Sequence, residues 1–311
     1  MILVAGSANL DFVVRADHIP APGETVLGRD FKTFPGGKGA NQAVACARAG
    51  GVATQMLLAL GSDAFAIPLE ESLQGAGVRL LTVRETEHPT GTAFICVSDA
   101  GENAITVAPG ANTCLQPEHL PPLTGFTHLL LQLETPLDAV TAYARAARAA
   151  GVTVVLNAAP ARVLPPELLS LVDILIVNEG ELSTVAQCDG SIAECMARLD
   201  LPTVVVTLGA QGCAARHQGA FHLQASFAIT PVDSTGAGDT FCGALCAALC
   251  HGHALDKALR YASAAAALAC TELGAQSSIP EAAEVTALLA QQADNNTPTR
   301  LAALRALCGL T

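Results

Sequence analysis

The chain has 311 residues, of which 51% are hydrophobic, and carries a formal net charge of −12 at pH 7. This size supplies a core for one large α/β domain or two small ones, and the acidic balance argues against nucleic-acid binding, which needs a basic face. No apolar run approaches the roughly 18 residues of a membrane span, and the N-terminus lacks a basic signal region, so we expect a cytoplasmic protein without a membrane partner.

The first predicted element is a buried strand over residues 2–6, which polar residues follow directly. Asn9 and Asp11 lie just past its carboxyl end. Ligands of parallel α/β proteins bind at that end of the strands, so both residues are candidates for substrate binding. An Asx turn is the alternative interpretation, because Asn and Asp also form such turns.

The next region, residues 12–34, predicts a small β flap outside the main sheet rather than a βα unit. It contains short β-like pieces around prolines, and two later stretches are of the same kind. A flap over a site excludes water when it closes, which protects a reactive phosphate. The β-like pieces are residues 12–14, 25–27, 31–34, 92–97 and 104–107, the last two joined by a turn at 99–103.

A glycine-rich stretch, residues 36–42, opens a predicted helix that runs to about residue 49. It is not a P-loop, because Lys32 stands where the first glycine is required and Gly39 replaces the Ser or Thr. Glycines as dense as Gly37 and its neighbours allow a polyhydroxy ligand close to the backbone, with Lys38 and Asn41 as hydrogen-bonding partners. The alternative is a plain loop-to-helix junction with a solvated lysine.

Strands and helices alternate from about residue 53. This order predicts a mostly parallel sheet with helices on both faces, in one α/β domain over residues 1–311 that carries lid strands from about 12–34 and 92–107. The predicted strands are 54–60, 128–133, 153–156, 174–177 and 203–208, and the predicted helices are 64–75, 137–150, 165–171, 179–187, 192–199, 241–250 and 254–270, with a weak final helix at 301–307.

Polar residues follow four of these strands in succession, which points to one shared crevice at the carboxyl edge of the sheet. Asn178 and Glu181 are three residues apart at a helix start, so a capping box is one interpretation. An acid near phosphates can instead organise Mg²⁺ through water. The residues at strand ends are Glu134, Asn157, Asn178 with Glu181, and Thr207 with Gly209.

The stretch from Asp233 to Thr240 reads Asp-Ser-Thr-Gly-Ala-Gly-Asp-Thr, immediately before a predicted helix. Gly236 and Gly238 place free N–H groups at the helix N-terminus, which favours an anion such as phosphate. Asp239 beside such an anion makes sense as a base that deprotonates an attacking hydroxyl. An ordinary N-capping aspartate after a glycine turn is the alternative.

The helix over residues 254–270 ends near Gly274, which fits a C-cap. Carbonyls at such an end, close to Asp233, can ligate a monovalent cation; a plain C-cap is the alternative.

The eleven cysteines include no Cys-x-x-Cys pair and are interpreted as reduced thiols in the core. Cys242, Cys246 and Cys250 share one helix face, where packing is favoured over a metal site.

Four motifs together resemble the ribokinase family of sugar kinases over about residues 1–290. Each motif alone is modest, but their order and spacing agree with the family, and further stretches at 101–103, 108–112, 131–134 and 157–161 resemble its ribokinase branch. The four motifs are Gly6-Ser7-Ala8-Asn9-Leu10-Asp11, Gly36-Gly37-Lys38-Gly39-Ala40-Asn41-Gln42-Ala43, Asn178-Glu179-Gly180-Glu181 and Asp233 to Phe241.

The resemblance implies ATP-dependent phosphorylation of D-ribose on its 5-hydroxyl, with Mg²⁺, an activating K⁺ ion and a homodimer formed through the lid. It implies roles as follows: Asn9, Asp11, Gly37, Lys38, Asn41 and Glu134 for ribose; Asp239 as base; Gly236, Ala237 and Gly238 as anion hole; Asn178, Thr207, Gly209, Gly212, Gly238 and Ser263 for the nucleotide; Glu181 near Mg²⁺; and Asp233, Thr235, Ala269, Glu272, Gly274 and Ser278 for K⁺.

Two residues depart from the family pattern. Ser263 stands where a larger polar residue often lies near adenine, which leaves the nucleotide preference open, and Ala158 replaces a common proline.

Three alternative functions remain: a kinase for another pentose such as deoxyribose, a kinase for a nucleoside such as adenosine, and a sugar-binding regulator that has lost catalysis. The intact Gly-Ala-Gly-Asp stretch disfavours the regulator.

Overall fold

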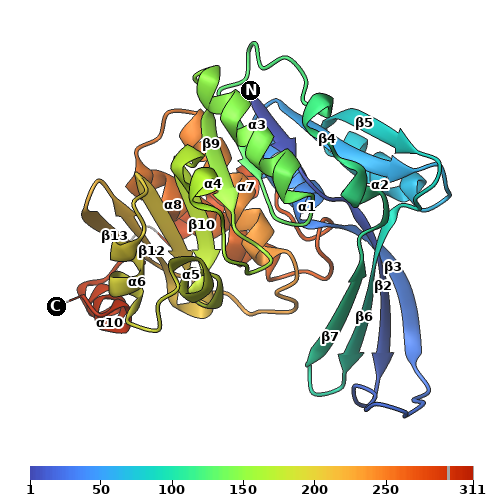
Figure 1. Cartoon of the computed structure of the whole chain (residues 1–311). Helices are drawn as coiled ribbons and strands as arrows, with labels where there is room; N and C mark the ends of the chain where they lie inside the picture. Colours follow the sequence, from blue (N-terminus) through green and yellow to red (C-terminus); the bar gives the residue numbers. More distant parts are fainter. Residues whose placement is uncertain (293–294, 311) are drawn as a thin grey trace.

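The structure, a computed structural model, describes residues 1–292 and 295–310. In this part nine strands form one sheet, parallel except for an antiparallel hairpin at one edge (Figure 1). The predicted α/β fold is confirmed. The strands in spatial order are β13 (Ala220–Ala225), β12 (Gly212–His217), β11 (Thr203–Thr207), β10 (Ile174–Asn178), β9 (Thr153–Asn157), β8 (His128–Leu131), β1 (Ile2–Ala5), β4 (Thr54–Gly61) and β5 (Arg79–Glu85).

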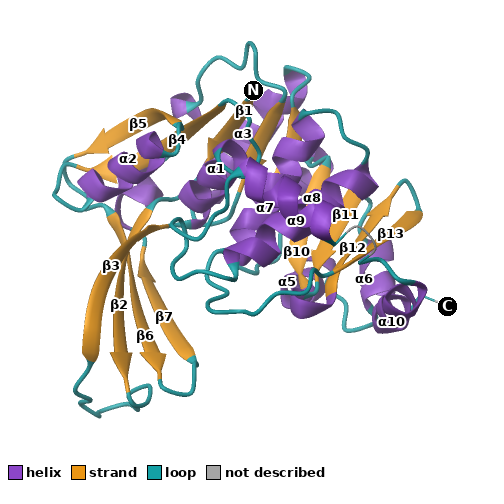
Figure 2. Ribbon diagram, turned by 180° about the vertical axis from the view of Figure 1, so that it is seen from behind, coloured by secondary structure: helices purple, strands orange, loops and turns teal. Residues whose placement is uncertain are grey.

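Helices cover both faces of this sheet, so its central strands are mostly apolar and mostly buried. Alternate residues of β1 enter opposite cores, with Ile2 and Val4 in one and Leu3 and Ala5 in the other. On the first face lie α1 (Lys38–Ala47), α2 (Ala66–Gly75), α7 (Ala237–Cys250), α8 (Leu255–Ala269) and α9 (Ala282–Gln291), several of which are in front in Figure 2. On the other lie α3 (Leu137–Ala149), α4 (Pro166–Leu171), α5 (Glu179–Ala186), α6 (Ile192–Arg198) and α10 (Pro298–Cys308).

Four further strands of the described chain form a second sheet that projects from the body (Figures 1 and 2). We call it the lid: β3 (Arg29–Gly36), β2 (Asn9–Ala16), β6 (Gly91–Ser98) and β7 (Asn103–Ala108), in this spatial order. The flap is thus where the sequence predicted it, but the prediction of a β piece at 25–27 is wrong. Strand β2 ends at Ala16 and pairs with β3 only as far as Arg29, so residues 25–27 lie beyond the end of their neighbour.

Several elements were not predicted. Strand β5, helix α9 and the hairpin β12–β13 are absent from the sequence-based assignment, and α10 begins at Pro298, three residues earlier than expected. Residues 293 and 294, in the polar stretch before α10, lie outside the described residues. Short 3-10 turns complete the chain at η1 (Gly110–Cys114), η2 (Pro117–His119) and η3 (Gly209–Gln211). Within residues 1–292 and 295–310, none of the helices has the length and apolar content to cross a membrane.

Candidate active site

Helix α7 begins with a glycine turn. Its N-cap residue, Gly236, has φ +74°, a left-handed conformation that favours glycine. A Cβ on Gly236 would lie 3.1 Å from the Ala275 backbone, whereas a Cβ on Gly238 would meet no described atom within 4 Å. The N–H of Ala237 donates to the carbonyl of Ser234 at 3.2 Å. The open side of the turn therefore lies at Gly238, where a helix N-terminus attracts anions.

The carboxylate of Asp239 is held by two amide side chains from α1. Asn41 Nδ2 donates to its Oδ2 at 2.9 Å, and Gln42 Nε2 donates to its Oδ1 at 2.9 Å. Asp239 is only 9% exposed. Since both partners are donors, they fit the ionised form of the carboxyl group, which leaves lone pairs on both oxygens for a further proton.

Gln42 is fixed in turn by a buried amide network. Its Nε2 also donates to Asn157 Oδ1 at 3.0 Å, and its Oε1 accepts from Gln132 Nε2 at 2.6 Å. Asn157 Nδ2 donates to the Ile176 carbonyl at 3.1 Å, which sets the orientation of that amide. The chain of contacts connects the carboxyl ends of β9 and β10 to Asp239. The sequence placed Asn157 at this edge but gave Gln42 and Gln132 no role. The available signal was Gln132, a polar residue between two leucines at the end of a predicted strand.

A second group of polar residues lies around the start of β2 and is joined by hydrogen bonds. Asn9 Oδ1 accepts from Asn112 Nδ2 at 2.8 Å. Glu134 Oε2 accepts from Ser7 Oγ at 2.5 Å and from the Lys38 N–H at 3.1 Å. The sequence prediction did not assign a role to Ser7 or Asn112. These contacts join the end of β1, the loop after β8 and the start of α1.

Gly37 explains why the glycine-rich stretch is needed. Its φ is +90°, and a Cβ there would lie 2.7 Å from both Ala8 Cα and Asn9 N. The turn before α1 therefore packs directly on the backbone at the end of β1. Asp11, in β2, is close to this turn, since a Cβ on Gly36 would lie 2.2 Å from its Oδ2.

Negative charge accumulates around Lys38. Asp239 and Glu134 raise the pKa of Lys38 against the opposing effect of burial, with a smaller contribution from Glu181. Burial raises the pKa of Asp11 to about 7, helped by Glu134 and Asp239. Burial also raises the pKa of Glu181, although hydrogen bonding by Asn178 and the charge of Lys38 oppose it. Because acidic groups outnumber Lys38 here, binding of a further cation to the site is electrostatically favourable.

The predicted capping box at the start of α5 forms: Asn178 N–H donates to Glu181 Oε2 at 2.8 Å, and Glu181 N–H donates to Asn178 Oδ1 at 2.8 Å. The same two residues nevertheless line a cavity of about 170 Å³ together with Lys38 and Asp239. Asn178 and Thr207 are register partners in β10 and β11, so the predicted crevice at the carboxyl edge exists.

A second cavity, of about 500 Å³, adjoins the first, since Thr207 and Gly238 line both. It contains the predicted nucleotide residues Gly209, Gly212 and Ser263. Its walls also include residues to which the sequence gave no role, namely Phe227, Ala228, Ile229, Ala266, Cys270 and Arg300. A third cavity, of about 720 Å³, lies between the lid and the body and is lined by Asp11 and by Asp233.

Asp233 binds the loop after α8. Its Oδ1 accepts from the Thr235 N–H at 2.9 Å and from Thr235 Oγ1 at 2.7 Å, and its Oδ2 accepts from the Gly274 N–H at 3.0 Å. Burial raises its pKa, but these bonds outweigh burial and the net shift is downward. Ala269 and Ser278 are buried nearby in sequence, whereas Glu272 is exposed. The structure thus brings Asp233, Thr235 and Gly274 into direct contact.

All eleven cysteines are free thiols, as the sequence predicted, and most are buried. Cys242 and Cys246 on α7 belong to the core, which agrees with packing as their role.

Comparison with known proteins decides the family. The model of the pfkB family of carbohydrate kinases matches residues 1–282. The chain belongs to this family. A ribokinase of Haemophilus influenzae is 38% identical over 300 residues, which cover 93% of this chain and 98% of that protein. The crystal structure of a Thermotoga maritima ribokinase has a TM-score of 0.85 at 34% identity and covers 93% of this chain and 99% of its own.

A third relative is an Arabidopsis thaliana ribokinase, whose structure was determined as a complex with ribose and ATP. It has a TM-score of 0.84 at 35% identity and covers 93% of this chain and 98% of its own. As a pfkB-family carbohydrate kinase, the protein is an ATP-dependent phosphotransferase with a sugar alcohol group as acceptor. Such kinases use ATP with Mg²⁺, and the acidic oxygens of the 170 Å³ cavity are the donors this cation prefers.

Proposed function

We propose that this kinase phosphorylates D-ribose on its 5-hydroxyl and releases ribose 5-phosphate and ADP. The observation that carries the proposal is the position of Asp239, a buried carboxylate at the open N-terminus of α7. Asp239 lines the 170 Å³ cavity, and the preceding residue, Gly238, lines both this cavity and the 500 Å³ cavity. The Arabidopsis ribokinase complexed with ribose and ATP, which shares the fold, supports the choice of both substrates.

In the proposed mechanism, Asp239 accepts the proton of the 5-hydroxyl while that oxygen attacks the γ-phosphorus in line with the leaving ADP oxygen. The turn Gly236–Gly238 receives the transferring phosphoryl group, and Gly238 lies nearest to it. The N–H of Ala237 is bonded to Ser234, so Ala237 is part of the turn but does not offer a free donor. Asn41 and Gln42 hold the carboxyl group of Asp239 in a fixed orientation. Most of the catalysis then comes from positioning and electrostatics.

The remaining residues divide between the two substrates. Asn9, Asp11, Gly37, Lys38, Asn41 and Glu134 would hold the ribose hydroxyls, and Asn178, Thr207, Gly209, Gly212 and Ser263 would contact the nucleotide. Glu181 would hold Mg²⁺ through water, using the oxygen that does not cap α5. Magnesium, when bound, neutralises charge on the β- and γ-phosphates.

We further propose a K⁺ site at the loop held by Asp233. The residues are Asp233, Thr235, Ala269, Glu272, Gly274 and Ser278, acting largely through carbonyl oxygens. The carboxylate bonds to Thr235 and Gly274 support this, because they connect the glycine turn of α7 to the end of α8. An ion there would stiffen the turn that receives phosphate.

The direct test is an ADP-release assay across D-ribose, 2-deoxyribose, other pentoses and adenosine, with K⁺ or with Na⁺ at equal ionic strength. D-ribose with K⁺ is expected to give the highest kcat/KM. A higher value for adenosine or deoxyribose would replace the substrate proposal, and no ADP release with any sugar would support the regulator instead. Equal rates in K⁺ and Na⁺ would remove the cation proposal alone.

Asp11 gives a prediction about pH. A carboxylate accepts sugar hydroxyls better than a carboxylic acid does, and the pKa of Asp11 is about 7. The KM for D-ribose is therefore expected to rise as pH falls below about 7, while in Asp11→Asn it is high and does not follow this pH dependence. A wild-type KM that is constant between pH 6 and pH 8 would contradict the assignment.

Asp11 also affects stability, but here the protonated carboxyl group is the favourable form, whereas sugar binding favours the carboxylate. The unfolded carboxyl titrates near 3.8 and the folded one near 7, so between these values the folded state binds more protons and stability falls as pH rises. Without sugar, Asp11→Asn is thus expected to raise the free energy of unfolding by roughly 2–4 kcal/mol above pH 7, and by less near pH 4. Denaturant unfolding at the two pH values measures this difference.

We propose that residues 1–311 act as one kinase domain whose lid also forms a homodimer. In an aromatic cluster on one face of the lid, Phe12 stacks on Phe31 and Phe94 and is met edge-on by Phe65, the residue before α2. Phe94 remains 54% exposed. Exposed apolar patches of this kind mark interfaces. Phe94→Glu is expected to convert a dimer to a monomer in light scattering, whereas Phe221→Glu, on β13, keeps the dimer. A wild-type monomer at micromolar concentration would contradict this proposal.

A further inference from the structure

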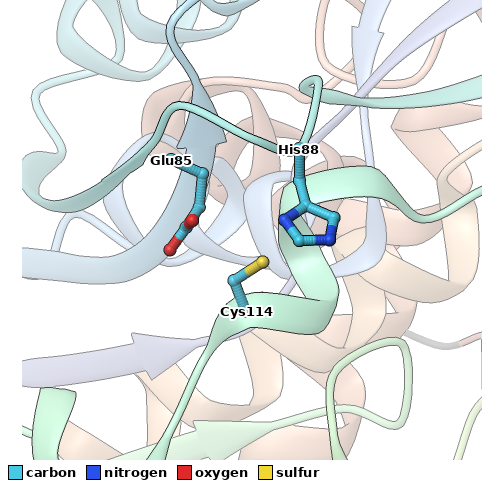
Figure 3. Close-up of side chains that lie close together, drawn as sticks. All are labelled: Glu85, His88 and Cys114. Atoms are coloured by element: carbon cyan, nitrogen blue, oxygen red, sulfur yellow. The ribbon is translucent and has the colours of Figure 1, made fainter.

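Three side chains with metal-binding chemistry meet outside the cleft. They are Glu85, His88 and Cys114, and among the described residues their carboxylate oxygen, ring nitrogen and sulfur all lie within 4.8 Å of one another. Figure 3 shows the three side chains converging, with the sulfur of Cys114 between the carboxyl group and the imidazole in that view. Glu85 and Cys114 are half-buried and His88 is exposed, so the cluster is open to solvent on one side.

The segments that carry these groups are the two connections of one half of the lid to the body. Glu85 ends β5, and His88 lies in the loop that leads into lid strand β6. Cys114 ends η1, which follows lid strand β7. The Ala111 N–H donates to the Pro89 carbonyl at 2.8 Å, so the backbone already holds the two connections together without the side chains of the cluster.

The donor set selects a class of ion. Thiolate, imidazole and carboxylate are the ligands of Zn²⁺ and related transition cations, whereas Mg²⁺ and K⁺ prefer oxygen alone. Tetrahedral coordination with bonds of about 2.0–2.3 Å brings ligand atoms to roughly 3.3–3.8 Å from one another. The three atoms here lie within 4.8 Å of one another, so binding of an ion draws them closer together. Three protein ligands leave a fourth position for water.

Without a bound cation, the surroundings of Cys114 oppose ionisation of its thiol. Burial raises the pKa of Cys114, which Glu85 raises further against a hydrogen bond from Thr113. A cation at the cluster reverses this preference, since it binds the thiolate and neutralises the carboxylate next to it.

We infer that Glu85, His88 and Cys114 form a binding site for a thiophilic divalent transition cation, with Zn²⁺ as the ion of best fit. The site lies at the root of the lid and is separate from the Mg²⁺ and K⁺ positions of the cleft. A bound ion cross-links the β5–β6 connection to η1. Asn112, two residues before Cys114 in η1, donates to Asn9 at 2.8 Å, so the ion also restrains the segment next to the sugar pocket.

The experiment uses Co²⁺ as a spectroscopic probe on the full chain after chelator treatment. One equivalent of Co²⁺ is expected to produce the near-ultraviolet sulfur-to-cobalt charge-transfer band and the visible bands of tetrahedral coordination, and Zn²⁺ is expected to displace it. Cys114→Ser abolishes the charge-transfer band, and His88→Ala weakens Co²⁺ binding at least tenfold. Cys96→Ser, which removes another half-buried thiol of the lid region, leaves both unchanged.

His88 is exposed, so His88→Ala tests the site even where Cys114→Ser perturbs folding. A wild-type chain without a charge-transfer band overturns the inference, as does a band that survives Cys114→Ser. Loss of the band in Cys195→Ser but not in Cys114→Ser also overturns it, because the ion then binds the neighbouring thiols Cys188 and Cys195. Thermal unfolding adds an independent readout: Zn²⁺ raises the Tm of the wild type and not that of His88→Ala.

Discussion

Replacing Asp239 by Asn is expected to lower kcat by about 10²–10⁴-fold, the range supplied by a positioned general base. Asparagine has nearly the same shape, but its amide nitrogen cannot accept the proton of the sugar hydroxyl. One of the donors Asn41 and Gln42 also loses its acceptor, which adds a smaller loss of orientation. Binding of D-ribose, followed by calorimetry, is expected to change by much less than kcat.

The matched control is Asp256→Asn. Asp256 is also an aspartate in the first turn of a helix, α8, but it is exposed and outside the cleft. If Asp239 serves only to favour the helix N-terminus, both substitutions have similar small effects on unfolding, about 0.3–1 kcal/mol, and neither changes turnover. Near-normal kcat in Asp239→Asn would support that structural interpretation and remove the proposed base.

Gly238→Val is expected to reduce kcat/KM for ATP by about 10²-fold or more without a comparable loss of stability. A Cβ at this position meets no described atom within 4 Å, so the folded protein accommodates a side chain. The open space that it enters is shared by the 170 Å³ and 500 Å³ cavities, where the γ-phosphate is proposed to lie. A side chain there keeps the phosphate away from the N–H groups of the turn, and the loss of one anion-stabilising contact in such a site typically has this effect.

Gly75→Val provides the comparison, because Gly75 is also helical and its Cβ meets no described atom, but it lies on α2 away from these two cavities. The two variants are expected to unfold similarly in thermal melts and to differ in ATP kinetics. If Gly238→Val has a normal KM and kcat, the phosphoryl group does not pass this turn.

The order of the fold and one edge of the site could be read from the sequence. Parallel strands end at the same edge, so Asn157, Asn178 and Thr207 could be placed together before any contact was known, and all three line the 170 Å³ cavity. The edge elements were harder to predict. Strand β5 and the hairpin β12–β13 are partly exposed and contain polar residues, so they lack the continuous apolar runs of the central strands.

The partners of buried polar groups could not be predicted in the same way. Helical periodicity places Gln42 on one face of α1, but it does not show that Gln132, just past the end of β8, and Asn157, at the end of β9, meet it. Arg300, on α10, lines the 500 Å³ cavity, although the sequence assigned no role to this helix. The other residues of the cavity are far from Arg300 in the sequence, so no local pattern connects them. Both depend on tertiary contacts rather than on spacing.

The measurement that tests the central claim most directly is a crystal structure with D-ribose and a non-hydrolysable ATP analogue. The expected result is the ribose 5-oxygen within about 2.6–3.2 Å of an Asp239 carboxylate oxygen, with the γ-phosphate over the turn at Gly238 and the 5-oxygen opposite the bridging atom. A carboxyl group of Asp239 directed away from both ligands, or a phosphate bound elsewhere, would contradict the account.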